Sequence, residues 1–447
     1  MNRNSLIVFL AMGCTGSSTD AETGTPPDPP DATGDTAAPA FVDCPDGPCV
    51  VEGPITADRT FFADNAYLLL GTVVVGNDAD EVTLTIEAGA TVLGDVDTQG
   101  TLVVSRHADI VAEGTAESPI VMTSSAMPGT RARGDWGGLV LNGRAQTNGA
   151  GTAETGPYGG TTDDDDSGVL RYVRIEFSGA ELLPDEPVPG LRLNAVGSRT
   201  RIDHVQIHRG QGDGFGILGG TVDLRYVVAS QAGDDGFDWA DGWTGRAQWV
   251  VVQSPQNEES GSPGIEGGNL ASEPRVGPPF SAPILANVTL VGDPETTREP
   301  VGIFLRHGTR GEVWNTLVSD FRGACLDIDG AVTWEGVDTG AIDVRGSRFA
   351  CPAVAVVDDQ DLTDDGMFDP ADPIDLVAWF SEPARGNTNP LTLDWLGEPR
   401  SATSPVFGST ETGAVPGPTD TFFDETDIVG AIGTDAWTAG WTAYPVN

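Results

Sequence analysis

Short runs of β-branched and aliphatic residues alternate with Gly, Asn and Asp from about residue 67 onward. The first such runs are Tyr67–Val75, Val82–Glu87, Thr101–Ser105 and Ile120–Ser124. Runs of this length between turn residues predict β-strands. No amphipathic helical pattern appears before residue 360, and we expect one short helix at 374–380. The pattern therefore predicts an all-β protein.

The middle of the chain repeats with a period of 22 residues. HVQIHRGQGDGF (204–215) aligns with YVVASQAGDDGF (226–237), which sets Asp213 over Asp235 and Phe215 over Phe237. Looser copies begin at residues 249, 287 and 315. A coil this short cannot bury its own apolar face, so stacked coils must build one continuous core. The period predicts a β-solenoid of about ten to twelve coils.

A family resemblance runs over roughly residues 60–442. It is carried by LTIEAGATVLG (84–94), GTAESPIVMTS (114–124), GDWGGLVLNGRA (134–145), GDDGFDW (233–239), GIFLRHGT (302–309) and FFDETDIVGAIGTDAWTAGWT (422–442). As a set, these motifs resemble a widespread family of bacterial secreted β-helix proteins. The resemblance implies a right-handed parallel β-helix at the cell envelope, with no established activity and no catalytic residues to transfer. We place the β-helix at 41–355 and a C-terminal capping or packing segment at 356–447.

The N-terminus has the pattern of a bacterial lipoprotein signal. Arg3 precedes an apolar run at 6–12, and Gly13 and Cys14 follow it. The next residues, up to 40, include no large apolar side chain, which is typical of a solvated tether. We therefore expect a signal peptide at 1–13, lipidation of Cys14 and a disordered tether at 14–40. The alternative is an ordinary secreted protein cut near this point.

The residue after the cysteine indicates where such a lipoprotein would be sorted. Thr15, rather than Asp, follows Cys14. This is similar to Gram-negative lipoproteins that are anchored in the outer membrane. We expect a monomer in the cell envelope, anchored in the outer membrane through its lipid and exposed at the surface.

The four remaining cysteines predict two disulfides. Cys44 and Cys49 flank a Pro-Asp-Gly-Pro turn, and Cys325 and Cys351 are 26 residues apart, about one coil. Stacked positions on neighbouring coils lie about 4.8 Å apart, within the Cα separations that disulfides adopt. The alternative is four free, buried thiols.

The charge balance limits the partners. The chain carries 67 acidic residues against 23 basic ones, which are all Arg, for a net charge of −44. Such a chain repels nucleic acid and anionic headgroups, so we expect no nucleic-acid partner. Divalent cations are natural counter-ligands, although acidic surfaces also serve solubility alone. The Asp run at 162–167 is interpreted as such a solvated surface.

One acidic segment has the spacing of an EF-hand-type calcium loop. DLTDDGMFDPAD (361–372) offers oxygen ligands at alternate positions and a glycine at position six, with Asp in place of the usual Glu at position twelve. The predicted calcium ligands are Asp361, Thr363, Asp365, the carbonyl of Met367, Asp369 and Asp372. The alternative is an acidic surface turn.

A ladder of carboxylates is the second candidate for chemistry. If Phe237, Ile265 and Leu326 share an inward column, their successors Asp238, Glu266 and Asp327 face outward together, interrupted by Phe304. Carboxylates about 5 Å apart cannot all stay ionised without a cation or a raised pKa. Staggered loops that hold them apart are the alternative.

The fold class also hosts polysaccharide lyases and hydrolases, which is an analogy only. Gly233-Asp234-Asp235 resembles the paired aspartates of polygalacturonases, but the other motifs of those enzymes are absent. We expect a structural or glycan- or protein-binding β-helix without catalysis. The alternative is a lyase or glycoside hydrolase for acidic polysaccharide, with its site at Asp234, Asp235, Asp238, Glu266 and Arg306. Trp239, Trp243 and Trp249 are candidates for stacking on sugars, and packing of ladder aromatics is the alternative.

Overall fold

The computed structural model describes residues 44, 47–184, 186–256, 261–270, 277–356, 375–398, 401 and 408–447. The predicted lipidation site, Cys14, and the predicted calcium loop at 361–372 lie outside these residues. Within the part described, no helix is long and apolar enough to cross a membrane.

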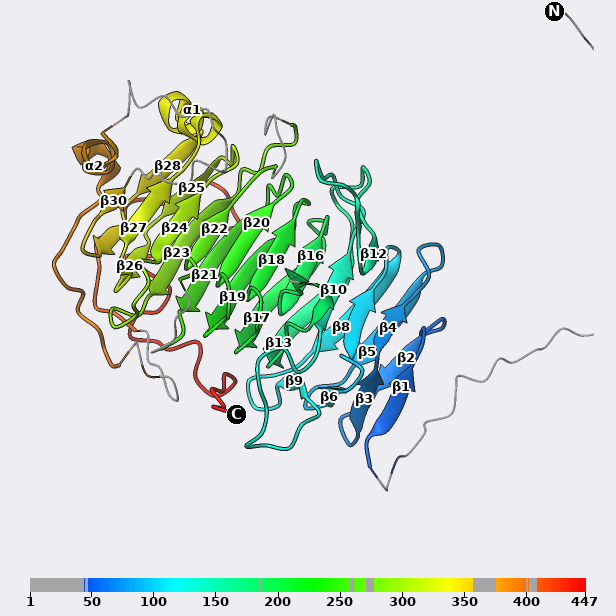
Figure 1. Cartoon of the computed structure of the whole chain (residues 1–447). Coiled ribbons are helices and arrows are strands. Elements are labelled where there is room, and N and C mark those ends of the chain that lie inside the picture. The colour runs from blue at the N-terminus through cyan, green and yellow to red at the C-terminus, as the bar shows by residue number, and fades with distance from the viewer. Residues whose placement is uncertain are drawn as a thin grey trace, which may run out of the picture. The chain divides into compact units, whose positions relative to one another are not determined.

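Two long sheets of parallel strands make up the body of the chain (Figure 1). The sixteen-stranded sheet contains β1 (Cys49–Glu52), β2 (Arg59–Phe61), β3 (Ala66–Leu70), β5 (Val82–Ile86), β6 (Thr91–Gly94), β8 (Ala108–Glu113), β9 (Ile120–Ser124), β13 (Gly168–Glu176), β17 (Arg201–His208), β19 (Asp223–Ser230), β21 (Arg246–Gln253), β23 (Ile284–Val291), β25 (Gly311–Trp314), β26 (Leu317–Ser319), β28 (Ile342–Arg345) and β29 (Arg348–Ala350). The ten-stranded sheet contains β4 (Thr72–Val75), β7 (Thr101–Val104), β10 (Gly138–Asn142), β16 (Leu191–Asn194), β18 (Phe215–Leu218), β20 (Phe237–Ala240), β22 (Ile265–Gly267), β24 (Val301–Leu305), β27 (Ala324–Ile328) and β30 (Ala355–Val356).

The chain alternates between the two sheets, which is the topology of a parallel β-helix. Each strand pairs with its counterpart one coil later, and the predicted stacking of Phe215 on Phe237 is confirmed. The ten strands of the second sheet agree with the expected ten to twelve coils. Two short hairpins leave the coils: β11 (Thr152–Ala153) with β12 (Gly156–Pro157), and β14 (Glu181–Leu183) with β15 (Glu186–Pro187).

Inward-facing aromatic side chains fill the middle of the core. Phe237, Trp239 and Trp243 are fully buried and contact one another, with ring centroids 5.9 to 6.4 Å apart. The indole N–H of Trp239 donates to Thr309 Oγ1, and that of Trp243 donates to the carbonyl of Val222. Of the two alternatives for Trp239 and Trp243, packing is confirmed and sugar stacking is excluded, because both side chains lie inside the β-helix. Trp249 is buried on the other sheet.

Three short helical segments interrupt or follow the coils. Helix α2 (Leu376–Phe380) agrees with the helix expected at 374–380, and a 3-10 turn, η1 (Pro383–Arg385), follows it. Helix α1 (Ala331–Thr339) was missed by the sequence pattern. Its contact with the hydrophobic core is made by Trp334 and Val337, which are separated by about one helical turn. A stretch rich in Val, Thr and Gly has low helix propensity, so the buried face outweighs the local preference here.

Both predicted disulfides are present. Cys44 is bonded to Cys49, and Cys325 to Cys351, with Cα separations of 5.4 and 5.5 Å. The second bond joins β27 to the coil that follows it. It therefore links the last two coils covalently.

The C-terminal segment lies against the outer face of the sixteen-stranded sheet. Amide side chains along this face donate to its backbone carbonyls: Gln206 to Ala443, Gln248 to Asp424, Asn287 to Ile428 and Asn315 to Val415, at 2.8 to 3.0 Å. Trp441 is fully buried in a cluster with Val228 and Val251 of the same sheet. This sheet face is thus occupied by the chain itself.

The interpretation of the Asp run at 162–167 as a solvated surface is wrong for Asp165. This side chain is buried, forms an ion pair with Arg144 at 2.6 Å and accepts from the Arg144 backbone N–H. Asp163 accepts from both the backbone and the side-chain amide of Gln146. The run therefore fastens a loop to the coils.

Candidate functional site

One column of residues runs along the outer face of the ten-stranded sheet. In strand register it consists of Val74, Val103, Val140, Arg192, Gly216, Asp238, Glu266, Phe304 and Asp327. The inward positions beside it are Phe237, Ile265, Ile303 and Leu326. This is the predicted arrangement, in which Asp238 and Glu266 are adjacent and Phe304 separates Glu266 from Asp327.

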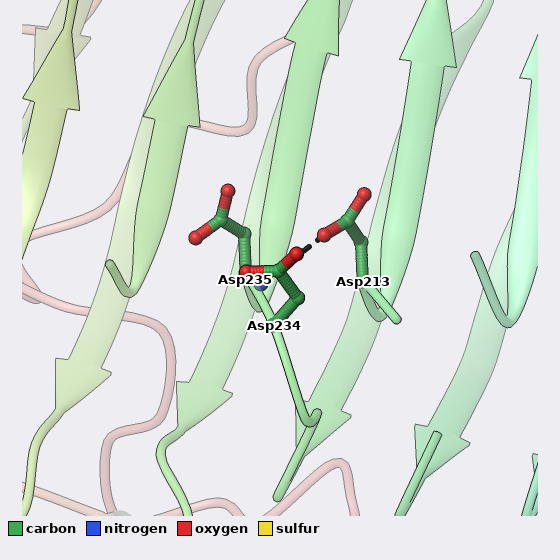
Figure 2. Close-up of side chains that lie close together, drawn as sticks. All are labelled: Asp213, Asp234 and Asp235. Carbon is green, nitrogen blue, oxygen red and sulfur yellow. Dashed lines mark hydrogen bonds between the residues drawn. The ribbon is translucent and has the colours of Figure 1, made fainter. Parts of the chain in front are cut away.

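The turns that lead into β18 and β20 bring further carboxylates to the start of this face. Asp213 precedes β18 and Asp235 precedes β20, and the backbone N–H of Asp235 donates to Asp213 Oδ1 at 3.1 Å (Figure 2). The coils approach closely here: a Cβ added to Gly214 would lie 2.5 Å from the carbonyl oxygen of Gly236. The Asp-Gly-Phe repeat thus places one aspartate above another on successive coils.

Five carboxylates form two overlapping groups, which we call the acidic cluster. In the first group, Asp213, Asp234 and Asp235 each offer an oxygen within 4.8 Å of the others. In the second, Asp235, Asp238 and Glu266 do the same. Figure 2 shows that the three aspartates of the first group come from two neighbouring turns. Asp235 belongs to both groups and lies where they meet.

Asp235 is the most buried member of the acidic cluster. Its exposed fraction is 6%, and its Oδ1 atom is buried without a hydrogen-bond partner among the residues that the structure describes. A buried carboxylate oxygen without a partner is costly unless a proton or a cation compensates it. The unpartnered Asp235 oxygen of the acidic cluster can therefore bind either a proton or a cation.

Burial and the closeness of the carboxylates raise the pKa values of three members of the cluster. Burial, and then the charge of Asp234, raises the pKa of Asp213 from 3.8 to about 8. Burial, and then Glu266 and Asp213, raises the pKa of Asp235 well above its ordinary value. Burial, and then Asp213 and Glu266, does the same for the pKa of Asp238. Without a cation, burial and mutual repulsion therefore favour the protonated form of these carboxyls.

Arg306 contacts the cluster from the next coil. The Nη2 and Nε atoms of Arg306 lie 2.7 and 2.8 Å from Glu266 Oε1. Its guanidinium also lies 5.1 Å from the ring centroid of Phe304, in cation–π contact. A positive group, an aromatic ring and the carboxylates thus share one face. At the other side of the cluster, Ser262 Oγ donates to Asp234 Oδ1 at 2.8 Å.

The structure brings together all five residues that the sequence offered for a catalytic site. Asp234, Asp235, Asp238 and Glu266 are members of the acidic cluster, and Arg306 is bonded to it. Asp213 was missed, although the 22-residue alignment had already set it over Asp235. Asp327 stays in the column but lies beyond Phe304.

The cluster suits a hard cation better than hydrolysis of a glycosidic bond. Calcium takes six to eight oxygen ligands, and carboxylates are typical donors. Retaining glycosidases hold their two carboxyl groups about 5–5.5 Å apart, and inverting ones hold theirs about 6.5–9.5 Å apart to leave room for a water molecule. The nearest oxygens within each group here lie inside 4.8 Å. This spacing favours a shared cation or proton over two independent acid and base groups.

Comparison with known proteins identifies the family. The model of the pectate-lyase-like β-helix domain matches residues 53–374, more than two thirds of the chain. No curated protein and no solved structure matches the chain. The matched range includes every strand of the two long sheets except β1, and it contains every residue of the acidic cluster together with Arg306. The chain therefore belongs to the family of pectate-lyase-like β-helix domains.

Proposed function

We propose that this protein binds an acidic polysaccharide on the outer face of the ten-stranded sheet, through a calcium ion held by the acidic cluster. The observation that carries the proposal is Asp235, a buried carboxylate with an unpartnered oxygen where two groups of carboxylates meet. A calcium ion there would compensate charges that otherwise require protons. The family name points to the same substrate class, because pectate is a polymer of uronic acid.

The side chains beside the cluster suit a uronic-acid polymer. Calcium keeps ligand positions beyond those that a protein fills, and carboxylates of the glycan can occupy them. The half-buried ring of Phe304 offers an apolar surface, and Arg306 holds positive charge next to it. An acidic protein would otherwise repel an acidic glycan, so the cation is essential to this proposal.

The test is binding of the purified protein to polygalacturonate, with calcium and with chelator. We expect retention on the polymer in calcium and release by chelator. Fully methyl-esterified pectin is the matched control, since it has the same backbone without the carboxylate charge. Equal retention on the esterified polymer, or retention that survives chelation, would contradict the proposal.

Cleavage of the bound polymer by elimination is a second candidate function. It is favoured by Arg306, which lies against the cluster where a calcium-bound uronate would sit. The binding reactions should be followed for ultraviolet absorbance and for new reducing ends. Unsaturated products would indicate a lyase, reducing ends alone a hydrolase, and neither a binding protein.

For the location we propose anchoring in the outer membrane through Cys14, with the β-helix at the cell surface on the tether of residues 14–40. The support is the lipoprotein-like start of the chain, since these residues lie outside the structure described. A fatty-acid probe should label the protein in cells, and Cys14→Ala should abolish the label. Continued labelling of the variant would refute the anchor.

A further inference from the structure

The outer column of the ten-stranded sheet is covered on one side of the acidic cluster. Val103 and Val140, the second and third positions of the column, are buried and pack against Val188. Leu182, from the β14–β15 hairpin, packs against the same valines. The N-terminal part of this sheet face is therefore occupied by the chain itself.

The same covering segment ends directly beside the cluster. We call residues 186–190 the wall. A Cβ added to Gly216 would lie 2.6 Å from Pro189 Cγ, so Pro189 lies on the column position next to Asp238. A Cβ added to Gly212 would lie 3.0 Å from the carbonyl oxygen of Pro187. The wall thus contacts the turn that carries Asp213.

Several contacts hold the wall in place. The backbone N–H of Gly190 donates to the carbonyl of Asp213 at 2.9 Å, and that of Val188 donates to the carbonyl of Ala180 at 3.2 Å. Val188 is fully buried, and Pro187 and Pro189 each have a fixed φ. A segment with these contacts cannot swing away without exposing buried valines to water.

On the opposite side of the cluster the column stays partly exposed as far as Phe304. Asp238, Glu266 and Phe304 are each partly exposed along three successive coils. A glycan that lies along the column can therefore extend from Asp238 over Phe304. It cannot extend the other way, since Pro189 covers Gly216.

We propose that the acidic cluster takes the end of a polysaccharide chain and not an internal stretch. The terminal sugar stops against the wall beside Asp213, and the rest of the glycan leaves over Glu266 and Phe304. The inference rests on the proposed function, because it concerns the same site. A wall of this kind provides specificity by steric exclusion, without adding affinity.

The test compares calcium-loaded protein with two oligogalacturonates, one twice as long as the other and both longer than the exposed column. Isothermal titration calorimetry gives the number of protein molecules that each oligomer binds. We expect the same number for both lengths, because both have the same ends. A number that doubles with the length would overturn the inference. Absence of binding to either oligomer would instead contradict the proposed function itself.

A wall variant provides the second test. Replacing residues 181–189 by a short glycine linker should let the longer oligomer bind about twice as many protein molecules as the shorter one, because each oligomer then offers internal sites. Leu183→Ser is the matched control, since Leu183 is 42% exposed, and it should leave the number unchanged. A thermal melt shows whether each variant is folded. A folded wall variant that still binds independently of length would show that the wall is not the stop.

Discussion

Replacing Asp235 by Asn should abolish most of the stabilisation that calcium gives to the protein, while the metal-free protein becomes more stable. Both effects arise from the same carboxylate. In the metal-free state the Asp235 carboxyl either retains a proton that the unfolded chain has released or places a charge beside Asp213, Asp238 and Glu266, and asparagine avoids both costs. In the calcium-bound state the ionised carboxylate is a ligand. A residue that only maintains the fold cannot produce these opposite signs.

The expected effects are changes in the free energy of unfolding of a few kcal/mol. A ligand that binds only the folded state stabilises it by about 2.7 kcal/mol at a hundredfold excess over its Kd. Loss of even an outer partner of a metal ligand lowers affinity by about 10–100-fold, so the loss of a ligand should reach the upper end of this range. At the same calcium concentration the variant would then gain only a few tenths of a kcal/mol. Asparagine avoids the desolvation cost of an unpaired buried carboxylate, which should make the metal-free variant more stable by about 1–3 kcal/mol.

The measurement is urea unfolding at pH 8, in calcium and in chelator. Asp97→Asn is the matched control, because Asp97 is exposed in a turn that is distant from the acidic cluster along the chain. Both variants replace an aspartate by asparagine. Asp365→Ala separates any contribution of the 361–372 loop, which stays a prediction. If Asp235→Asn responds to calcium as strongly as the wild type does, the acidic cluster does not hold the ion. If the metal-free variant is less stable, Asp235 is compensated in another way.

The period of the repeat explains why much of the site could be predicted from the sequence. In a parallel coil the stacked positions have fixed register, so an alignment of two coils also states which side chains are neighbours. This placed Asp238 beside Glu266 and would have placed Asp213 beside Asp235. The wall could not be predicted in this way, because residues 180–190 leave the repeat and their partners are not neighbours in any alignment.

The burial of two tryptophans and of one aspartate could not be read from the sequence, for physical reasons. Trp239 and Trp243 were candidates for sugar stacking as well as for packing, and alternation along β20 turns Trp239 into the core. Asp165 was assigned to solvent because it lies within a run of four aspartates. Its partner Arg144 is distant in sequence, and no local pattern identifies it. Composition predicts that acidic residues are exposed on average, whereas a single buried ion pair depends on how the folded chain brings two distant residues together.

The stability of the metal-free protein should fall as the pH rises toward 8. Three carboxyls of the cluster have a raised pKa in the folded state: about 8 for Asp213, and well above the ordinary value for Asp235 and Asp238. Above pH 4 the unfolded chain has released these protons and the folded chain still holds them. The stabilisation is therefore complete below pH 4 and is lost as the pH rises through the folded pKa, by at most about 1.4 kcal/mol per pH unit for each group.

The two groups outside the cluster with the most strongly shifted pKa values, His208 and Asp109, set the pH range in which the cluster is best measured. Burial lowers the pKa of His208 from 6.5 to about 3, so its contribution is complete above pH 6.5 and is lost only as the pH falls. Burial, and then Asp166, raises the pKa of Asp109 to about 6, so its contribution has largely gone by pH 7. Between pH 7 and pH 8 the slope should therefore come mainly from the cluster.

Calcium should remove this slope, because the ion replaces the protons that the folded cluster retains. The free energy of urea unfolding, measured between pH 7 and pH 8, should fall in chelator and stay level or rise in saturating calcium. Asp235→Asn should show a smaller fall in chelator, since one of the three carboxyls is gone, whereas Asp97→Asn should match the wild type. The reason is linkage: if calcium displaces protons, its affinity must increase with pH by the amount that the metal-free stability declines. If the free energy of unfolding changes equally with pH in calcium and in chelator, the ion and the protons bind at different sites. The acidic cluster would then bind protons but not calcium.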